Sequence, residues 1–248
     1  MLSRKCPTCS TELNIKSAQV TDYYVCTLCD KTYKEAELLK GLVSFFVEKG
    51  IEFLCYTKEN NTRTIVLFSG YNSSAKNTFA RERLQRYVDQ YNFDLIIVSI
   101  KQIETNVKSN YRLISLNILT VLANTLKINI ANIDFIAFSS GGILLSCFIG
   151  ALEMNSAIFI SAFSPNALFY LQDNFSFLRM NTEKEKRKSK VFIINQDLDD
   201  PFFSITNSEA EIILHSEAFD VSLIHNPNGK HRVWDTRNIL FSELILLN

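Results

Sequence analysis

Four cysteines near the N-terminus have the types and spacing of a metal site. Cys6 and Cys9 form one C-x2-C pair, and Cys26 and Cys29 form a second after sixteen intervening residues. Each C-x2-C turn offers two thiolates on one side, and zinc prefers four soft ligands in a tetrahedron. The pattern predicts one structural Zn²⁺ ion. Because four protein ligands close the coordination shell, no position remains for a catalytic water.

The surrounding residues 1–33 are similar to zinc ribbons, with a hairpin expected through 11–15 and 20–25. A redox dithiol is the alternative, but it normally needs one C-x-x-C beside a βαβ unit, whereas two are present here. Zinc ribbons contact nucleic acid, a protein partner or only their own domain. The ribbon carries few basic residues, which disfavours nucleic acid and leaves a protein partner open.

A second group of reactive residue types follows the apolar run 133–138, in the sequence Ala137-Phe138-Ser139-Ser140-Gly141-Gly142. This segment resembles the G-x-S-x-G nucleophile elbow of the α/β-hydrolases, with Ala137 at the first glycine position. Such an elbow needs small residues around the serine because neighbouring backbone comes close. The resemblance implies that Ser139 is a nucleophile. The alternative is an ordinary strand-to-helix turn containing serine and glycine.

The same resemblance implies an oxyanion hole. The predicted strand 64–68 runs into Ser69-Gly70-Tyr71, where the family usually has His-Gly-x. Serine replaces the histidine, and Gly70 is retained. The backbone N–H groups of Tyr71 and Ser140 would then be the two donors. A plain turn that uses its only glycine is the alternative.

The family places its acid after the strand predicted at 191–195, where this chain has Asp197, Asp199 and Asp200. Distance from the strand end favours Asp199, then Asp200, then Asp197. An acid in this loop would orient the catalytic histidine and stabilise its imidazolium form. The alternative is a turn and helix cap before Pro201.

The family's general base lies on the loop after the last strand, and His231 follows the strand predicted at 221–225. The chain has 3 histidines. His215 falls in a predicted helix and His225 ends a predicted strand, so His231 is favoured for the base. An exposed loop histidine without a catalytic role is the alternative.

Together these residues imply a serine hydrolase that cleaves an acyl ester or thioester of a small molecule through a Ser-His-Asp triad. An aromatic-rich stretch within 163–180 either caps an apolar pocket or forms a short helix over the sheet. Two other functions stay open. One is an inactive hydrolase-fold protein that docks a partner through the zinc ribbon, and the other is an acyltransferase that uses the same serine.

The elements that must position these residues are alternating strands and helices. The strands lack polar alternation, which indicates a mostly parallel sheet with helices on both faces, an α/β fold of α/β-hydrolase type. We expect a zinc ribbon at 1–33, a linking helix at 34–49 and a hydrolase-like domain at 50–248. Strands are predicted at 51–56, 64–68, 93–99, 133–138, 157–161, 191–195 and 221–225, and helices at 78–90, 111–126, 141–152, 208–216 and 237–247.

Composition excludes several classes of protein. Lys+Arg and Asp+Glu both number 26, so net charge gives no attraction to nucleic acid or an anionic membrane. The run 135–152 has no charge, but its serines and glycine pair argue against a membrane span. No secretory signal is expected, and free Cys55 and Cys147 beside a zinc site fit a reducing compartment. We therefore expect a cytoplasmic protein.

Overall fold

The computed structural model describes residues 14–17, 22–29, 31–34, 43–48, 50–57, 63–70, 73–81, 84, 88, 93–100, 111–181 and 189–233. The strands are β1 (Asn14–Ser17), β2 (Asp22–Cys26), β3 (Lys31–Lys34), β4 (Val43–Glu48), β5 (Ile51–Tyr56), β6 (Thr64–Phe68), β7 (Asp94–Ile100), β8 (Ile133–Phe138), β9 (Ser156–Ile160), β10 (Lys190–Gln196) and β11 (Asp220–Asn226). The helices are α2 (Ala75–Arg81), α4 (Tyr111–Thr120), α5 (Gly141–Ser146), α6 (Pro165–Asn181) and α7 (Pro201–Ser216), with a π turn at Val121–Thr125 and a 3₁₀ turn at Ile130–Asn132.

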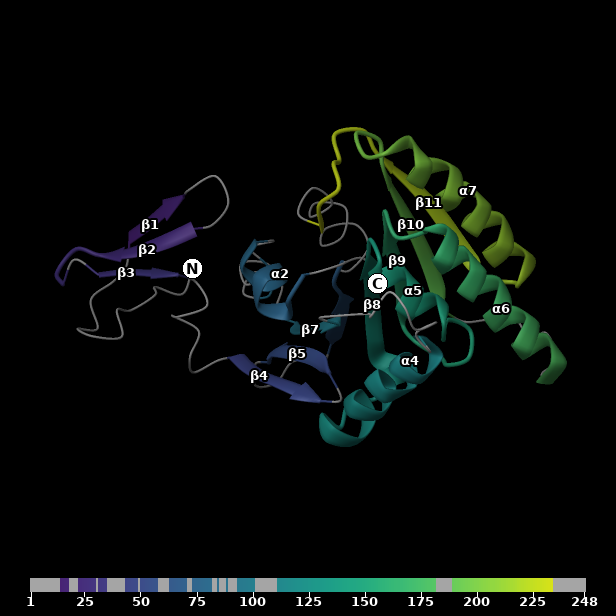
Figure 1. Ribbon diagram of the computed structural model, residues 1–248, viewed down its shortest axis with the longest axis horizontal. Coiled ribbons are helices and arrows are strands. Elements are labelled where there is room, and N and C mark those ends of the chain that lie inside the picture. Colours follow the sequence, from purple (N-terminus) through teal and green to yellow (C-terminus); the bar gives the residue numbers. More distant parts are fainter. Residues whose placement is uncertain are drawn as a thin grey trace.

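Strands β1, β2 and β3 form a small antiparallel sheet at the N-terminal end of the chain, drawn in purple in Figure 1. The hairpin predicted from the sequence is confirmed within the described residues, where its strands are Asn14–Ser17 and Asp22–Cys26. In this sheet Cys26 pairs with Lys31, so the Cys26–Cys29 segment forms the tight turn between β2 and β3.

The larger sheet has eight strands in the order β11-β10-β9-β8-β6-β7-β5-β4 (Figure 1). Strand β5 pairs antiparallel with both of its neighbours, β4 and β7. The other pairs in this sheet are parallel. The carboxyl ends of β6, β8, β10 and β11 therefore lie along one edge, which is where open parallel sheets place their sites. The predicted α/β architecture with a mostly parallel sheet is confirmed.

Two apolar cores lie on the two faces of this sheet. Val66 and Phe68 point into one core, which contains residues of α4, α5, α6 and α7. Ile65 and Leu67 point into the other core, with α2 and the buried Leu84 and Val88. Alternate residues of β6 thus meet apolar partners on opposite sides. This explains why its sequence shows no polar alternation.

The sequence predicts a linking helix at 34–49. This prediction is wrong over 43–48, because these residues form β4. The strand pairs antiparallel along its length with β5, and the ring of Phe46 stacks on Phe53 with centroids 5.0 Å apart. The apolar residues of this segment have helical spacing, but strand pairing with β5 outweighs that local preference. Residues 35–42 lie outside the described part of the chain.

Three predicted helices have different bounds in the structure. The one expected at 78–90 begins at Ala75, and the one expected at 141–152 is regular only as far as Ser146. Helix α7 begins seven residues earlier than predicted, at Pro201, because Asp200 caps it and proline suits the first helical turn. The helix predicted at 237–247 lies outside the described residues.

Candidate active site

Ser139 occupies a strained turn between β8 and α5. Its φ is +51°, in the left-handed region that residues with a Cβ seldom adopt. The backbone N–H of Ser139 donates to the carbonyl of Ile160 on neighbouring β9, at 3.2 Å. Strain of this kind persists only where surrounding structure enforces it, and it clusters at functional sites.

The two glycines after Ser140 allow this turn to form. A Cβ at Gly141 would lie 2.5 Å from the carbonyl oxygen of Phe68 on β6. A Cβ at Gly142 would overlap the carbonyl oxygen of Ala162 and lie 2.9 Å from its Cβ. Backbone on both sides therefore packs directly against the start of α5, which is the close approach that the sequence pattern predicts.

The residue after Ser139 offers a backbone donor beside it. Within the described part of the chain, the backbone N–H of Ser140 makes no hydrogen bond. Gly70 lies alongside, since a Cβ there would be 3.2 Å from the Cβ of Ser139. Tyr71, the other predicted oxyanion donor, lies outside the described residues.

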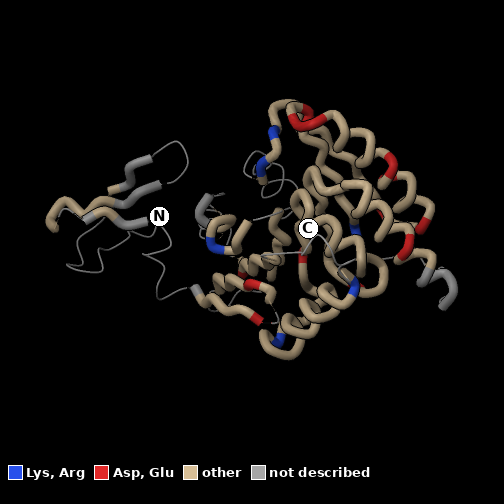
Figure 2. Tube along the Cα trace, viewed as in Figure 1, with Lys and Arg blue, Asp and Glu red and all other residues tan. Residues whose placement is uncertain are grey.

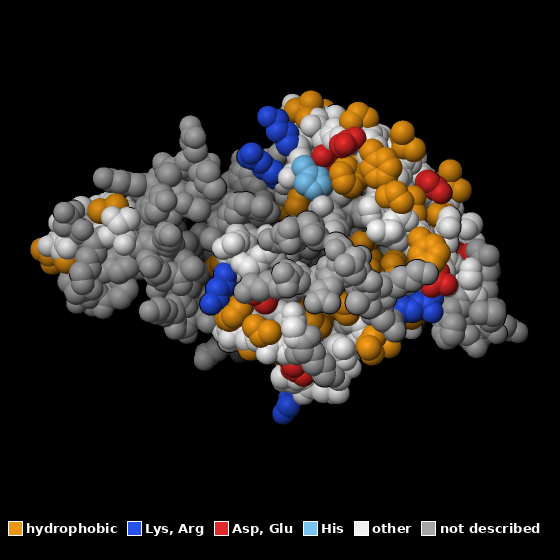
Figure 3. Space-filling model, viewed as in Figure 1, with side chains coloured by type: hydrophobic (Ala, Val, Ile, Leu, Met, Phe, Trp, Pro, Cys, Tyr) orange, Lys and Arg blue, Asp and Glu red, His pale blue; other side chains and the backbone are white. Residues whose placement is uncertain are grey.

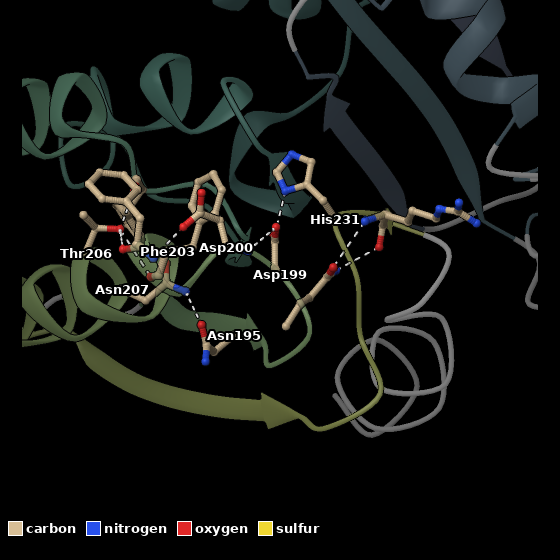
Figure 4. A network of polar contacts seen from close by, with 11 residues as sticks. Asn195, Asp199, Asp200, Phe203, Thr206, Asn207 and His231 are labelled. Carbon is tan, nitrogen blue, oxygen red and sulfur yellow. Dashed lines mark hydrogen bonds and ion pairs between the residues drawn. The ribbon is translucent and has the colours of Figure 1, made fainter.

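The aspartate loop and the histidine loop meet at Asp199 and His231, labelled in Figure 4. Nδ1 of His231 is 2.6 Å from Oδ2 of Asp199. The Asp199 side chain is 7% exposed, and its other oxygen accepts the N–H of Asp200 at 2.8 Å. The His231 side chain is 39% exposed. An Nδ1–H donated to Asp199 would leave Nε2 as the basic nitrogen of the neutral ring.

The other two candidate acids have different partners. Asp200 caps α7 by accepting the N–H of Phe202 at 3.0 Å. Asp197 lies 3.1 Å from Nδ1 of His225 and accepts an N–H of Asn195. The structure thus brings Asp199, and neither Asp197 nor Asp200, to His231.

Sequence reasoning missed Gln196, the last residue of β10. Its side chain is 2% exposed and forms two hydrogen bonds with the backbone of Arg232, directly after His231. Its Nε2 donates to the Arg232 carbonyl at 2.8 Å, and its Oε1 accepts the Arg232 N–H at 3.2 Å. The N–H of Leu198 also donates to the Gly229 carbonyl. These bonds tie the loop that carries Asp199 to the loop that carries His231.

Ser139 and His231 are not hydrogen-bonded to each other in the structure. The ring of Phe138, the residue before Ser139, lies 4.9 Å from the ring of His231, centroid to centroid. This contact brings the histidine loop against the end of β8. Bonds between a nucleophile and its base are often loose in enzymes without substrate.

The two isolated cysteines are poor competitors for the role of nucleophile. Burial raises the pKa of the Cys55 thiol to about 11 and that of the Cys147 thiol to about 12. Both thiols are therefore protonated at neutral pH, and the thiolate is the reactive form of cysteine.

The predicted zinc site remains a prediction, because Cys6 and Cys9 lie outside the described residues. The described residues include one of the two C-x2-C pairs, Cys26 and Cys29. Cys26 ends β2 and is fully buried, and Cys29 is half-buried in the same tight turn. These two thiols would hold one side of the ion, and its chemistry would be structural, with no part in catalysis.

Removal of zinc should unfold the ribbon and spare the body. We expect a purified protein to contain about one zinc per chain, and chelation to make residues 14–34 sensitive to protease. Cys26→Ser should lose the metal. Leu28→Ala, an exposed position in the same turn, should keep it. Full zinc content in Cys26→Ser would contradict the ligand assignment.

Comparison with known proteins gives similarity of fold at low sequence identity. No protein-family model matches the sequence, and no curated protein matches it. A solved ferulic acid esterase aligns with a TM-score of 0.61 and 11% identity, over 81% of this chain and 94% of that one. S-formylglutathione hydrolase (FrmB) from Staphylococcus aureus aligns with a TM-score of 0.54 and 15% identity, over 79% and 91% of the two chains. Mouse alpha/beta hydrolase domain-containing protein 10 gives 0.54 and 12%, over 81% and 96%.

The chain therefore has an α/β-hydrolase-like fold, which it shares with esterases and other hydrolases. Figure 2 shows acidic and basic positions spread along the described trace, without a continuous basic track. No helix in the described part of the chain is long and apolar enough to cross a membrane.

Proposed function

We propose that this protein is a serine hydrolase that cleaves an acyl ester or thioester. The observation that supports the proposal most strongly is the 2.6 Å Asp199–His231 pair. It lies at the sheet edge where Ser139 occupies a strained strand-to-helix turn. A nucleophile, a base and an orienting acid at one edge are the parts that acyl transfer requires.

In the proposed mechanism Oγ of Ser139 attacks the acyl carbonyl while Nε2 of His231 takes its proton. The Ser140 N–H, with that of Tyr71, stabilises the oxyanion. The carbonyl–leaving-group bond then breaks, and His231 returns the proton to the leaving oxygen or sulfur. Water, deprotonated by His231, then attacks the acyl-enzyme, the bond between Oγ of Ser139 and the acyl carbon breaks, and His231 returns the proton to Oγ as the acid leaves. Asp199 holds the tautomer of His231 and stabilises the imidazolium.

An apolar acyl group is the substrate that suits the surface beside His231. Figure 3 shows hydrophobic side chains gathered on one face of the molecule, several of them next to a histidine. Leu198 in the aspartate loop and Phe202 and Ile205 in α7 are exposed. An exposed apolar patch that borders a site indicates an apolar ligand.

The aromatic stretch within 163–180 fits the second of the two sequence hypotheses, a helix over the sheet, in its described side chains. It includes α6, which covers the sheet, and Phe163, Leu171 and Phe175 are buried in the core. The alternative, a helix over the sheet, is confirmed, although α6 has 17 residues and is not short. The proposal of an apolar acyl group therefore rests on the α7 side of the site.

Ester turnover tests the proposal. We expect the wild type to hydrolyse p-nitrophenyl esters and the matching acyl thioesters, with kcat/KM rising with acyl length. Ser139→Ala should lower kcat by about 10⁴-fold or more, with an unchanged melting temperature. Equal turnover by the two proteins would contradict the proposal. An added alcohol or thiol acceptor distinguishes hydrolysis from acyl transfer by the product formed.

A further inference from the structure

The imidazole of His231 contacts two aromatic rings from different elements. Phe203, in the first turn of α7, stacks on it with centroids 5.2 Å apart and an interplanar angle of 27°. Phe138, at the end of β8, contacts it at 4.9 Å and 41°. We call these two rings the aromatic clamp.

A single hydrogen bond cannot by itself fix an imidazole. The bond to Asp199 constrains Nδ1, but the ring can still turn about that contact, and Nε2 would then swing through a wide arc. The stacked ring of Phe203 and the tilted ring of Phe138 restrict how far the imidazole can turn. The clamp therefore determines the direction of Nε2, the atom that must exchange a proton with substrate.

His225 provides an internal comparison within the same protein. It also lies beside an aspartate, Asp197, but at 3.1 Å, and its side chain is 59% exposed. Among the described residues no aromatic ring contacts His225. Histidine–aspartate pairs thus occur at both His225 and His231, and a clamp of described residues accompanies only the pair at the candidate site.

From these contacts we infer that Phe203 is a positioning residue for His231. It holds the imidazole plane so that Nδ1–H points to Asp199 and Nε2 points to the substrate. The inference rests on the proposed function. Helix α7 links the parts, because Asp199 precedes it, Asp200 caps it, and the N–H of Phe203 donates to the Asp200 carbonyl at 2.9 Å.

The test replaces the aromatic face and keeps the apolar volume. Phe203→Leu should slow labelling by a fluorophosphonate probe about 2- to 10-fold, the range of an aromatic contact. In ester hydrolysis the same variant should have a lower kcat, with KM little changed. Phe203→Tyr retains the face and should recover most of the rate. Phe45→Leu is the matched control, because Phe45 is an exposed ring under Lys76 on the far edge strand β4.

Histidine NMR measures the ring environment and the tautomer of His231 without relying on activity. The chain has 3 histidines, so ¹⁵N-labelled imidazole signals can be assigned with His231→Gln. Wild type and Phe203→Tyr should show His231 mostly as the Nδ1–H tautomer, with ring protons shifted upfield by the stacked ring. Phe203→Leu should lose the upfield shift and gain Nε2–H tautomer. Phe203→Met serves in its place if the leucine variant does not fold.

The outcomes separate the clamp inference from the proposed hydrolase function. If Phe203→Leu matches Phe45→Leu in labelling rate and tautomer, or if Phe203→Tyr is as impaired as Phe203→Leu, the clamp inference is overturned. If folded wild type is never labelled, the proposed function fails, and the NMR signature alone still supports or overturns the clamp.

Discussion

Asp199→Asn should lower kcat for ester hydrolysis by about 10³- to 10⁴-fold, because an amide in place of the carboxylate favours the wrong histidine tautomer. The carboxylate of Asp199 is nearly buried and lies 2.6 Å from Nδ1 of His231. An Asn side chain can present its NH₂ group to Nδ1, which then becomes an acceptor. Nε2 would carry the proton and could no longer act as the base.

The neighbouring aspartates are matched controls for this substitution. Asp200→Asn should stay within about 3-fold of wild type, because asparagine caps helices as well as aspartate does. Asp197→Asn should also have little effect, since Asp197 pairs with His225 and not with His231. The measurement is kcat for all three variants under one set of conditions. A loss at Asp197 or Asp200 that equals the loss at Asp199 would contradict the assignment.

Gly142→Ala should lower both stability and activity, although alanine is the better helix former. The new Cβ would overlap the carbonyl oxygen of Ala162, which is backbone and cannot turn away. We expect a loss of about 1–3 kcal/mol in the free energy of unfolding. The start of α5 must also shift, and a displacement of about 1 Å at a reacting group can cost about 10²-fold in rate.

Gly50→Ala controls for the loss of a glycine elsewhere. Gly50 has a φ of +77° in the turn between β4 and β5, and a Cβ there would contact nothing within 4 Å. Its substitution should cost about 1 kcal/mol of stability through backbone strain and leave the labelling rate of Ser139 unchanged. Denaturant unfolding and labelling of both variants make the comparison. A Gly142→Ala protein with wild-type stability and rate would show that the turn is not tightly packed.

The features that the sequence predicts best are those encoded in contiguous residues. Apolar runs predict the strands because both faces of the sheet are covered. Ser139, Asp199 and His231 follow three of those strands, so their location at one edge follows from parallel pairing. Small residues at Gly141 and Gly142 indicate the tight turn because any Cβ there would meet backbone.

The features that sequence reasoning missed depend on contacts between distant segments. Gln196 and Arg232 are 36 residues apart, and the side chain that joins the two loops has no motif. Phe203 meets His231 only because α7 begins at Pro201 and turns that ring toward the histidine loop. Strand β4 has the apolar spacing of a helix, and only its pairing with β5 makes it a strand. Asp200 directly follows Asp199 in the sequence, and only the structure shows that it caps α7.

Labelling with a fluorophosphonate shows whether Ser139 is a nucleophile. The probe is added to folded wild type and to Ser139→Ala, and the modified peptide is located by mass spectrometry. We predict one adduct per chain, on Ser139, and none in the variant. Equal labelling of the two proteins, or a folded wild type that takes up no probe, would contradict this prediction.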